Sequence, residues 1–290
     1  MIHKQVQLAT GRNGTEIVIS YVEWPSDGPP VVLLHGLMGT WRFMSPFVPA
    51  LAASGWHVIA PDFRGHGDSG REQGCYSGEY YSADIRAFLE HEVKRPAILL
   101  GHSLGGLVAL YLAATLPNAV RAIIIGDSPI TMDELKHSFH AQLFAQTYQL
   151  MLRNADADET AQALGEMKVE LPALGGKTRV REIPGYDAAF LRFWAASLLK
   201  MDPDALRMTV DGSASRNWPG RVLFDNVACP VLLLQANPML GGLLQDADVE
   251  YAVQRNPGTV HVRLDRLGHS LQLIQAEPVI RPVMNFLDSL

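Results

Sequence analysis

Short apolar runs separated by helix-like stretches are the feature that most constrains how this chain of 290 residues can fold. An uninterrupted run of large apolar residues is typical of a strand buried on both faces. Strands that alternate with helices predict the α/β class, with a mostly parallel sheet covered by helices on both sides. The predicted strands lie at residues 31–34, 56–60, 97–100, 122–125, 231–234 and 261–264.

Two segments depart from this pattern. Residues 4–8 and 15–24 alternate polar and apolar side chains around a turn, which predicts an antiparallel hairpin at the edge of the sheet. Residues 128–226 contain no such apolar run and show helical spacing instead. We therefore expect a core domain formed by residues 1–127 and 227–290. The segment between them is expected to be an inserted helical cap, or lid, at the active-site end of the sheet.

A glycine-rich turn follows the third apolar run and carries the first candidate for chemistry. Its sequence is Gly-His-Ser-Leu-Gly, residues 101–105, and a helix-like run begins directly after it. A Gly-x-Ser-x-Gly pattern between a strand and a helix is typical of a serine nucleophile on a strained turn. Gly101 and Gly105 would let the strand and the helix pass closely. Ser103 is therefore the predicted nucleophile, and the backbone N–H of Leu104 is a predicted donor to an oxyanion.

Four motifs in a fixed order extend this interpretation. They are residues 34–39 (Leu-His-Gly-Leu-Met-Gly), residues 61–69 (Pro-Asp-Phe-Arg-Gly-His-Gly-Asp-Ser), the turn just described, and Gly-His at 268–269. With them the chain resembles the serine hydrolases of the α/β-hydrolase fold, close in pattern to small microbial esterases and cofactor-free perhydrolases. The resemblance implies that His269 is the general base for the serine and that the backbone N–H of Leu37 is the second oxyanion donor. It implies no cofactor.

The carboxylate that orients the histidine has two candidates. In the family the acid often follows the fifth buried strand, where this chain has Asn237 instead. Asparagine could orient His269 but could not offset the charge of its protonated ring, and the corresponding change in a serine protease costs about 10⁴ in rate. We favour Asp127, at the end of the fourth apolar run, over Asp246 in the later loop, because a strand end fixes a side chain more firmly than a long loop does.

Other polar residues near these motifs have structural interpretations. Arg64, His66 and Asp68 are expected to tie loops together by hydrogen bonds, because no ligand spacing predicts a metal site. His137 and His140 form a His-x-x-His pair in the cap. We expect both of these histidines on a solvated helix surface.

Composition excludes several classes of function. The net charge of −6 argues against nucleic-acid binding, which would select a basic face. No apolar stretch reaches the ~18 residues of a membrane span, and no signal peptide is evident. Cys75 and Cys229 lack metal-type spacing and are expected as free thiols. We therefore expect a soluble cytoplasmic protein with a small-molecule ester substrate and no nucleic-acid or membrane partner; the oligomeric state stays open.

The residues expected around the serine also indicate the kind of substrate. Leu37, Met38 and Leu104, with aromatic side chains from the cap, predict a mostly apolar pocket. The predicted function is that of a serine carboxylic-ester hydrolase that acts through an acyl-enzyme on a small to medium hydrophobic ester. The same residues could serve a perhydrolase, a lactonase or a hydrolase of carbon–carbon bonds, and a chain of this fold could also bind a ligand without catalysis.

Overall fold

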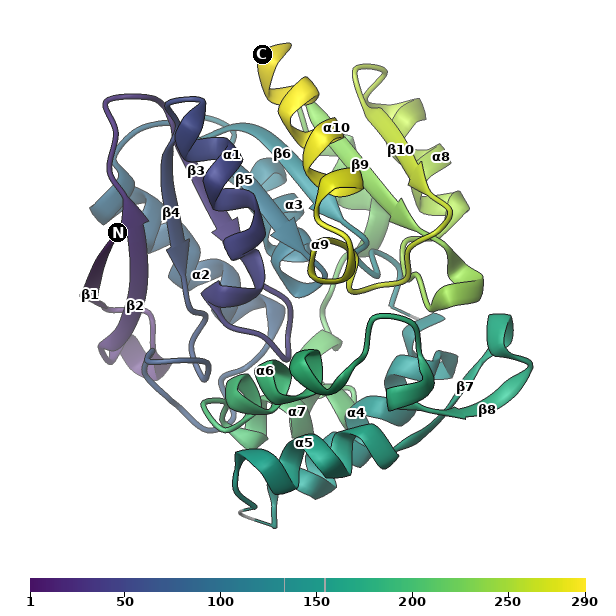
Figure 1. Ribbon diagram of the computed structural model, residues 1–290. Helices are drawn as coiled ribbons and strands as arrows, with labels where there is room; N and C mark the ends of the chain where they lie inside the picture. Colours follow the sequence, from purple (N-terminus) through teal and green to yellow (C-terminus); the bar gives the residue numbers. More distant parts are fainter. Residues whose placement is uncertain (133, 154) are drawn as a thin grey trace.

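A computed structural model describes residues 1–132, 134–153 and 155–290 of the protein, and within them a sheet of eight strands forms the centre of the molecule (Figure 1). In spatial order the strands are β1 (Ile2–Leu8), β2 (Ile17–Trp24), β4 (His57–Pro61), β3 (Pro30–Leu34), β5 (Ala97–His102), β6 (Val120–Gly126), β9 (Val231–Ala236) and β10 (Val260–Leu264). The strands from β4 to β10 pair in parallel, and the hairpin of β1 and β2 adds an antiparallel edge. The predicted α/β fold is confirmed.

The burial of each strand follows from its place in the sheet. Every residue of β3, β5 and β9 is buried, as their continuous apolar sequences predict. The last predicted strand differs, because β10 lies at the edge and exposes His261 and Arg263. Only Leu264 in β10 is fully buried. The expectation of a buried sixth strand was therefore wrong: an edge strand tolerates polar side chains on its solvated face.

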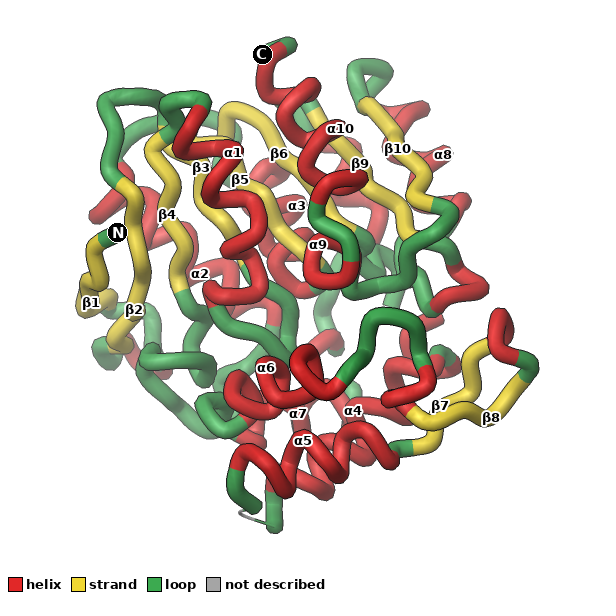
Figure 2. Tube along the Cα trace, viewed as in Figure 1, coloured by secondary structure: helices red, strands yellow, loops and turns green. Residues whose placement is uncertain are grey.

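Helices cover both faces of the sheet, as Figures 1 and 2 show. On one face, α1 (Val48–Ala53), α9 (Leu271–Ile274) and α10 (Glu277–Asp288) contribute to one apolar cluster. On the other face, α2 (Gly78–Phe88), α3 (Leu104–Thr115) and α8 (Asp246–Arg255) contribute to a second, larger cluster. This two-layer cover buries the apolar side chains of the central strands from both sides.

The chain between β6 and β9, residues 128–226, is termed the cap segment here. It contains α4 (Phe139–Met151), α5 (Ala157–Glu166), α6 (Ala188–Leu198) and α7 (Pro203–Val210). It also contains a hairpin of β7 (Lys168–Leu171) and β8 (Gly176–Arg179), where the sequence predicts only helices. Apolar Val169 and Leu171 alternate with charged Lys168 and Glu170, and this short alternation could have indicated a strand from the sequence.

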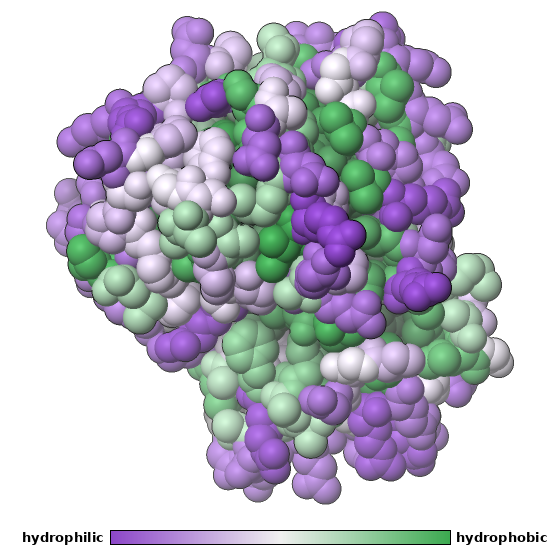
Figure 3. All heavy atoms as spheres, turned by 45° about the horizontal axis from the view of Figure 1, so that its top comes forward, coloured by the Kyte–Doolittle hydropathy of each residue, from purple (hydrophilic) through white to green (hydrophobic). Residues whose placement is uncertain are grey.

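The cap segment lies beyond the carboxyl ends of the parallel strands, at the lower end of the view in Figure 1. Three of its helices, α5, α6 and α7, begin where a short polar side chain caps them. Asp156, Asp187 and Asp202 each accept a hydrogen bond from a backbone N–H in the first turn that follows. Apolar residues reach the surface near the junction of the cap segment with the rest of the molecule (Figure 3). The cap segment thus covers the carboxyl ends of the parallel strands, where the active sites of such sheets lie.

Candidate active site

The turn between β5 and α3 holds Ser103 in a strained backbone conformation. Its φ is 54° and its ψ is −116°, a region that residues with a Cβ seldom adopt. A Cβ atom on Gly101 would lie 2.1 Å from the carbonyl oxygen of Gly105, and one on Gly105 would lie 2.1 Å from the carbonyl oxygen of Leu34. The strand and the helix therefore approach so closely that only glycine fits at these two positions, as the sequence predicts.

Hydrogen bonds from β6 and the residues after it keep this turn in place. The N–H of Ser103 donates to the carbonyl oxygen of Gly126 at 2.9 Å. The hydroxyl of Ser128 donates to the carbonyl oxygen of Ser103 at 2.8 Å. Both peptide groups of Ser103 are thereby fixed, which supports the strained φ.

Asp127 and His269 form a buried pair next to this turn. Nδ1 of His269 donates to Oδ2 of Asp127 at 2.7 Å. The carboxylate also accepts backbone N–H bonds from Ala236 at 3.1 Å, Leu243 at 2.9 Å and Leu244 at 3.2 Å. Burial acts to raise the pKa of Asp127, but the bonds from His269 and the backbone N–H groups outweigh it, and the pKa lies below its ordinary value of 3.8. Asp127 is therefore held as a carboxylate against the histidine.

Asp246, the other candidate for the acid, and Asn237, at the family's usual acid position, bond groups other than His269. Asp246 begins α8, where its carboxylate accepts from Nε2 of Gln235 at 2.7 Å and pairs with Arg263 at 3.3 Å. The side chain of Asn237 accepts from the N–H of Met239 and donates to the carbonyl oxygen of Asp265. Asn237 therefore caps a turn. The structure brings Asp127 to His269, as favoured from the sequence.

His102, the residue before the serine, holds the backbone of the histidine loop. Nε2 of His102 donates to the carbonyl oxygen of His269 at 2.7 Å, and the two ring centroids are 4.7 Å apart. Burial and the neighbouring His269 lower the pKa of His102 to about 3, so its ring is neutral near pH 7. Because His102 directly precedes Ser103, this bond places the His269 loop beside the serine turn.

The predicted oxyanion donors belong to two peptide groups at the same edge of the sheet. Leu104 is the first residue of α3, so its N–H has no acceptor within the helix. The carbonyl oxygen of Gly36 accepts from Nδ1 of His35 at 2.8 Å. Since the peptide is planar and trans, the N–H of Leu37 points away from His35. Leu37, Leu104 and Ser103 all line one cavity.

The loop after β4 ties these parts together, as predicted from the sequence. His66 donates from Nε2 to the carbonyl oxygen of Leu37 at 2.5 Å. Arg64, fully buried, pairs with Asp84 through two guanidinium nitrogens. Asp68 forms a 2.8 Å ion pair with Lys200 of the cap segment. The loop thus connects Leu37 and the cap segment to the main sheet.

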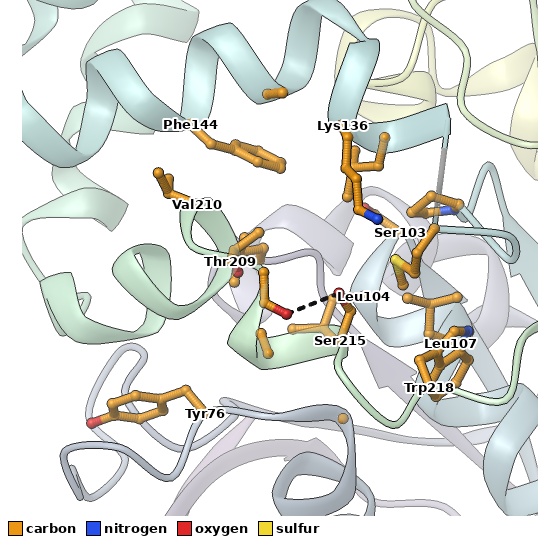
Figure 4. A pocket seen from close by; sticks show the side chains of 18 of the residues that line it. Tyr76, Ser103, Leu104, Leu107, Lys136, Phe144, Thr209, Val210, Ser215 and Trp218 are labelled. Atoms are coloured by element: carbon orange, nitrogen blue, oxygen red, sulfur yellow. Dashed lines mark hydrogen bonds between the residues drawn. The ribbon is translucent and has the colours of Figure 1, made fainter.

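A cavity of about 380 Å³ opens at Ser103 between the core and the cap segment (Figure 4). Phe144 reaches it from α4, while Trp218 and Tyr76 come from loops that no sequence pattern indicates as pocket walls. The wall is mostly apolar; its residues include Leu37, Tyr81, Leu104, Leu107, Val108, Pro129, Met132, Leu135, Ala141, Phe144, Val210, Ala214, Trp218 and Leu243. Such a cavity suits an apolar ligand group. Not every predicted cap aromatic lines it: Phe193 stacks on Phe43 at 4.8 Å.

His140 contradicts its sequence interpretation. It was expected on a solvated helix surface, but it lies on the inner face of α4 with 3% of its surface exposed. Its ring centroid is 4.6 Å from that of His269. The expectation failed because α4 packs this face on the core, and a His-x-x-His spacing carries no signal for burial. The side chain of His137 lies outside the described residues.

The described residues lack two features that other kinds of function would require. No group of three or more His, Cys, Asp or Glu side chains in them is arranged to hold a metal ion. None of the helices in this part of the chain combines the length and the apolar character that crossing a bilayer requires. Cys75 and Cys229 are free thiols, as predicted.

Comparison with known proteins agrees with this fold. The family model of the alpha/beta hydrolase fold matches residues 29–238. A pimeloyl-[acyl-carrier protein] methyl ester esterase of Aromatoleum aromaticum is 30% identical over 83% of this chain and 91% of its own length. An esterase of Mycobacterium tuberculosis is 27% identical over 93% of this chain and 87% of its own length. A carboxylesterase structure from the thaumarchaeon Nitrososphaera gargenis superposes with a TM-score of 0.77 at 18% identity, over 99% and 98% of the two chains.

The chain therefore belongs to the alpha/beta hydrolase fold family. Some curated relatives are matched over only part of their length. Four of them, 34–37% identical to this chain in the matched segment, are covered by it over 20–37% of their own length.

Proposed function

We propose that the protein is a serine carboxylic-ester hydrolase that works through an acyl-enzyme. Ser103 Oγ attacks the ester carbonyl carbon while His269 Nε2 takes its proton. Asp127 holds His269 through Nδ1 and offsets the charge of the imidazolium that forms. The N–H groups of Leu37 and Leu104 bind the carbonyl oxygen as it becomes an oxyanion, each contributing about 3 kcal/mol of transition-state stabilisation.

The second half of the reaction uses the same groups. When the tetrahedral intermediate collapses, the bond to the alcohol oxygen breaks and His269 returns the proton to that oxygen. Water then attacks the acyl carbon of the ester on Ser103, and His269 takes a proton from the water. Collapse of the second intermediate releases the carboxylic acid and returns the proton to Ser103. Every proton is accounted for by His269, and no cofactor is needed.

The observation that carries this proposal is the buried 2.7 Å bond between Asp127 and Nδ1 of His269. It fixes the ring so that Nδ1 carries a proton and Nε2 is free to accept one. The strained turn of Ser103 opens into a largely apolar cavity of about 380 Å³, which favours an apolar acyl or alcohol group over a charged one.

The test is hydrolysis of p-nitrophenyl esters with acyl chains of two to twelve carbons. We expect wild type to hydrolyse them, with an optimum at intermediate chain length set by the cavity. S103A should lose this activity, and a fluorophosphonate probe should label wild type but not S103A. A wild-type protein with no turnover on any ester and no labelling would refute the proposal and favour a non-catalytic binding protein.

A further inference from the structure

His140 lies where the cap segment meets the proposed base, and the steps above give it no task. Its ring is edge-to-face with that of His269, with centroids 4.6 Å apart and an angle of 73° between the planes. His102 contacts the same ring from β5 at 4.7 Å. Two further imidazoles, one from the core and one from the cap, therefore contact the ring of the general base.

One ring nitrogen of His140 is buried without a hydrogen bond. Nδ1 has no partner within the described part of the chain, although almost no surface of the residue is exposed. A buried polar atom left unpaired destabilises the folded protein. Such an atom calls for an explanation beyond packing.

The surroundings of His140 would accept an apolar ring instead. Phe139 lies 4.0 Å away and Phe144 lies 6.1 Å away, measured between ring centroids. Phenylalanine at position 140 would fill similar space without an unpaired nitrogen. Packing alone therefore does not account for a histidine here.

The imidazole of His140 is kept uncharged. Burial holds its pKa well below the ordinary value of 6.5, and the neighbouring His269 and His102 act in the same direction. The negative charge of this cluster is that of Asp127, bonded to the far nitrogen of His269. A neutral His140 places no like charge beside His269 when that ring takes the serine proton.

We propose that His140 is a positioning residue of the cap segment that fixes the plane of the His269 ring and gives the transient imidazolium a neutral, polar neighbour. The role rests on the proposed function, since it acts through His269 as the general base. It also makes the cap part of the catalytic arrangement, because the ring comes from α4 and the base from the loop before α9.

The decisive variant is H140F, which keeps an aromatic ring and removes both nitrogens. We expect kcat on the preferred p-nitrophenyl ester to fall about tenfold, with KM within about twofold of wild type. The rate of fluorophosphonate labelling at Ser103 should fall by the same factor. The midpoint of thermal unfolding should stay equal or rise, because the unpaired nitrogen is gone. H140Q, which keeps a neutral polar group, should retain more activity than H140L.

A matched control is T147V, which also removes a buried polar atom from α4, two turns further along. It should leave kcat and labelling unchanged. Wild-type kcat and labelling in H140F would overturn the proposal, as would an equal loss in T147V or a loss in H140F that follows a lower unfolding midpoint. An inactive wild type would instead refute the proposed function, so the two failures are distinguishable.

Discussion

At the scale of single residues, the candidate site depends on contacts that link distant parts of the chain. Asp127 bonds His269, which lies 142 positions later, and also three backbone N–H groups from the strand and loop after the cap segment. The pair could be proposed from the sequence because Asp127 ends a strand. Its full set of partners could not, since a backbone N–H donor such as that of Leu243 or Leu244 is not indicated by the residue type.

Replacing the carboxylate tests this assignment. D127N should lower kcat on a p-nitrophenyl ester by about 10⁴-fold, because the amide cannot offset the charge of the His269 imidazolium. D246N removes a carboxylate that bonds Gln235 and Arg263 near the surface, and it should keep kcat within about twofold of wild type. The opposite ranking of the two variants would reassign the acid to Asp246.

A second residue-scale prediction concerns Asp62, buried at the end of β4. Burial raises its pKa from 3.8 to about 7, against the backbone N–H bonds from Trp41 and Asp68 that lower it. Between those two pH values the folded protein keeps a proton on Asp62 that the unfolded chain has lost. The stabilisation linked to this proton is complete below about pH 4 and is lost as the pH rises through about 7.

The measurement is the free energy of unfolding of wild type minus that of D62N, followed from pH 5 to pH 8. Several buried histidines with lowered pKa act in the opposite direction in both proteins, and the difference removes their contribution. We expect the difference to fall as the pH rises, by at most about 1.4 kcal/mol per pH unit, and to level off above about pH 7. D27N, which alters an exposed carboxylate that does not act on Asp62, should keep the wild-type profile. A difference that rises with pH would contradict the sign.

At the scale of elements, the loop that carries His269 is held from both the core and the cap segment. His102 at the end of β5 bonds its backbone. Tyr186, just before α6, shares a 2.6 Å hydrogen bond with the hydroxyl of Ser270. The side chain of Ile274 in α9 packs on Gly185, where a Cβ atom would lie 2.5 Å from it. The position of His269 therefore depends on the docking of the cap segment.

Y186F tests the contribution of that hydrogen bond. Removing the hydroxyl leaves Ser270 without its partner from the cap, so the His269 loop should be less firmly placed. We expect kcat to fall about three- to tenfold with little change in KM, since a small misplacement of a catalytic group slows the reaction. Y251F removes a comparable bond to Asp225, which is remote from His269, and should leave kcat unchanged. Equal kcat in wild type and Y186F would show that the core alone positions the loop.

At the scale of the whole molecule, the sequence predicts the sheet well and the cap less well. The central strands are apolar on both faces, so their burial can be predicted from their residues alone. Two features of the cap segment have no comparable signal: the hairpin of β7 and β8, with four residues a strand, and the inward turn of His140. Which helix face is buried there depends on how the cap docks on the core, and helical spacing does not encode that.

From the strained backbone at Ser103 we predict an effect on the stability of the whole molecule. S103G should relieve the strain of the positive φ at position 103 and raise the midpoint of thermal unfolding by a few degrees. Strain of this kind destabilises the folded state by roughly 1–3 kcal/mol. The greater entropy of the unfolded chain with glycine offsets at most about 1 kcal/mol of the gain. S103A is the control, since it also lacks the hydroxyl but keeps a Cβ. Calorimetry should show the rise in S103G alone; equal midpoints for the two variants would mean that the turn holds no strain.

Positive φ values recur around the site. Ser103 has φ 54°, Asp127 has φ 44°, and Leu271, two residues after His269, has φ 23°. All three residues carry a Cβ, so each adds to the free energy of the folded state. At Asp127 and Leu271 a glycine would also remove a buried side chain, a loss that outweighs relief of the strain. At Ser103 no such loss opposes the gain, so selection for heat resistance alone would favour an inactive protein there. A library screened for thermal tolerance without an activity assay should be enriched in glycine at position 103, and recovering a stable working enzyme requires selection for both properties together.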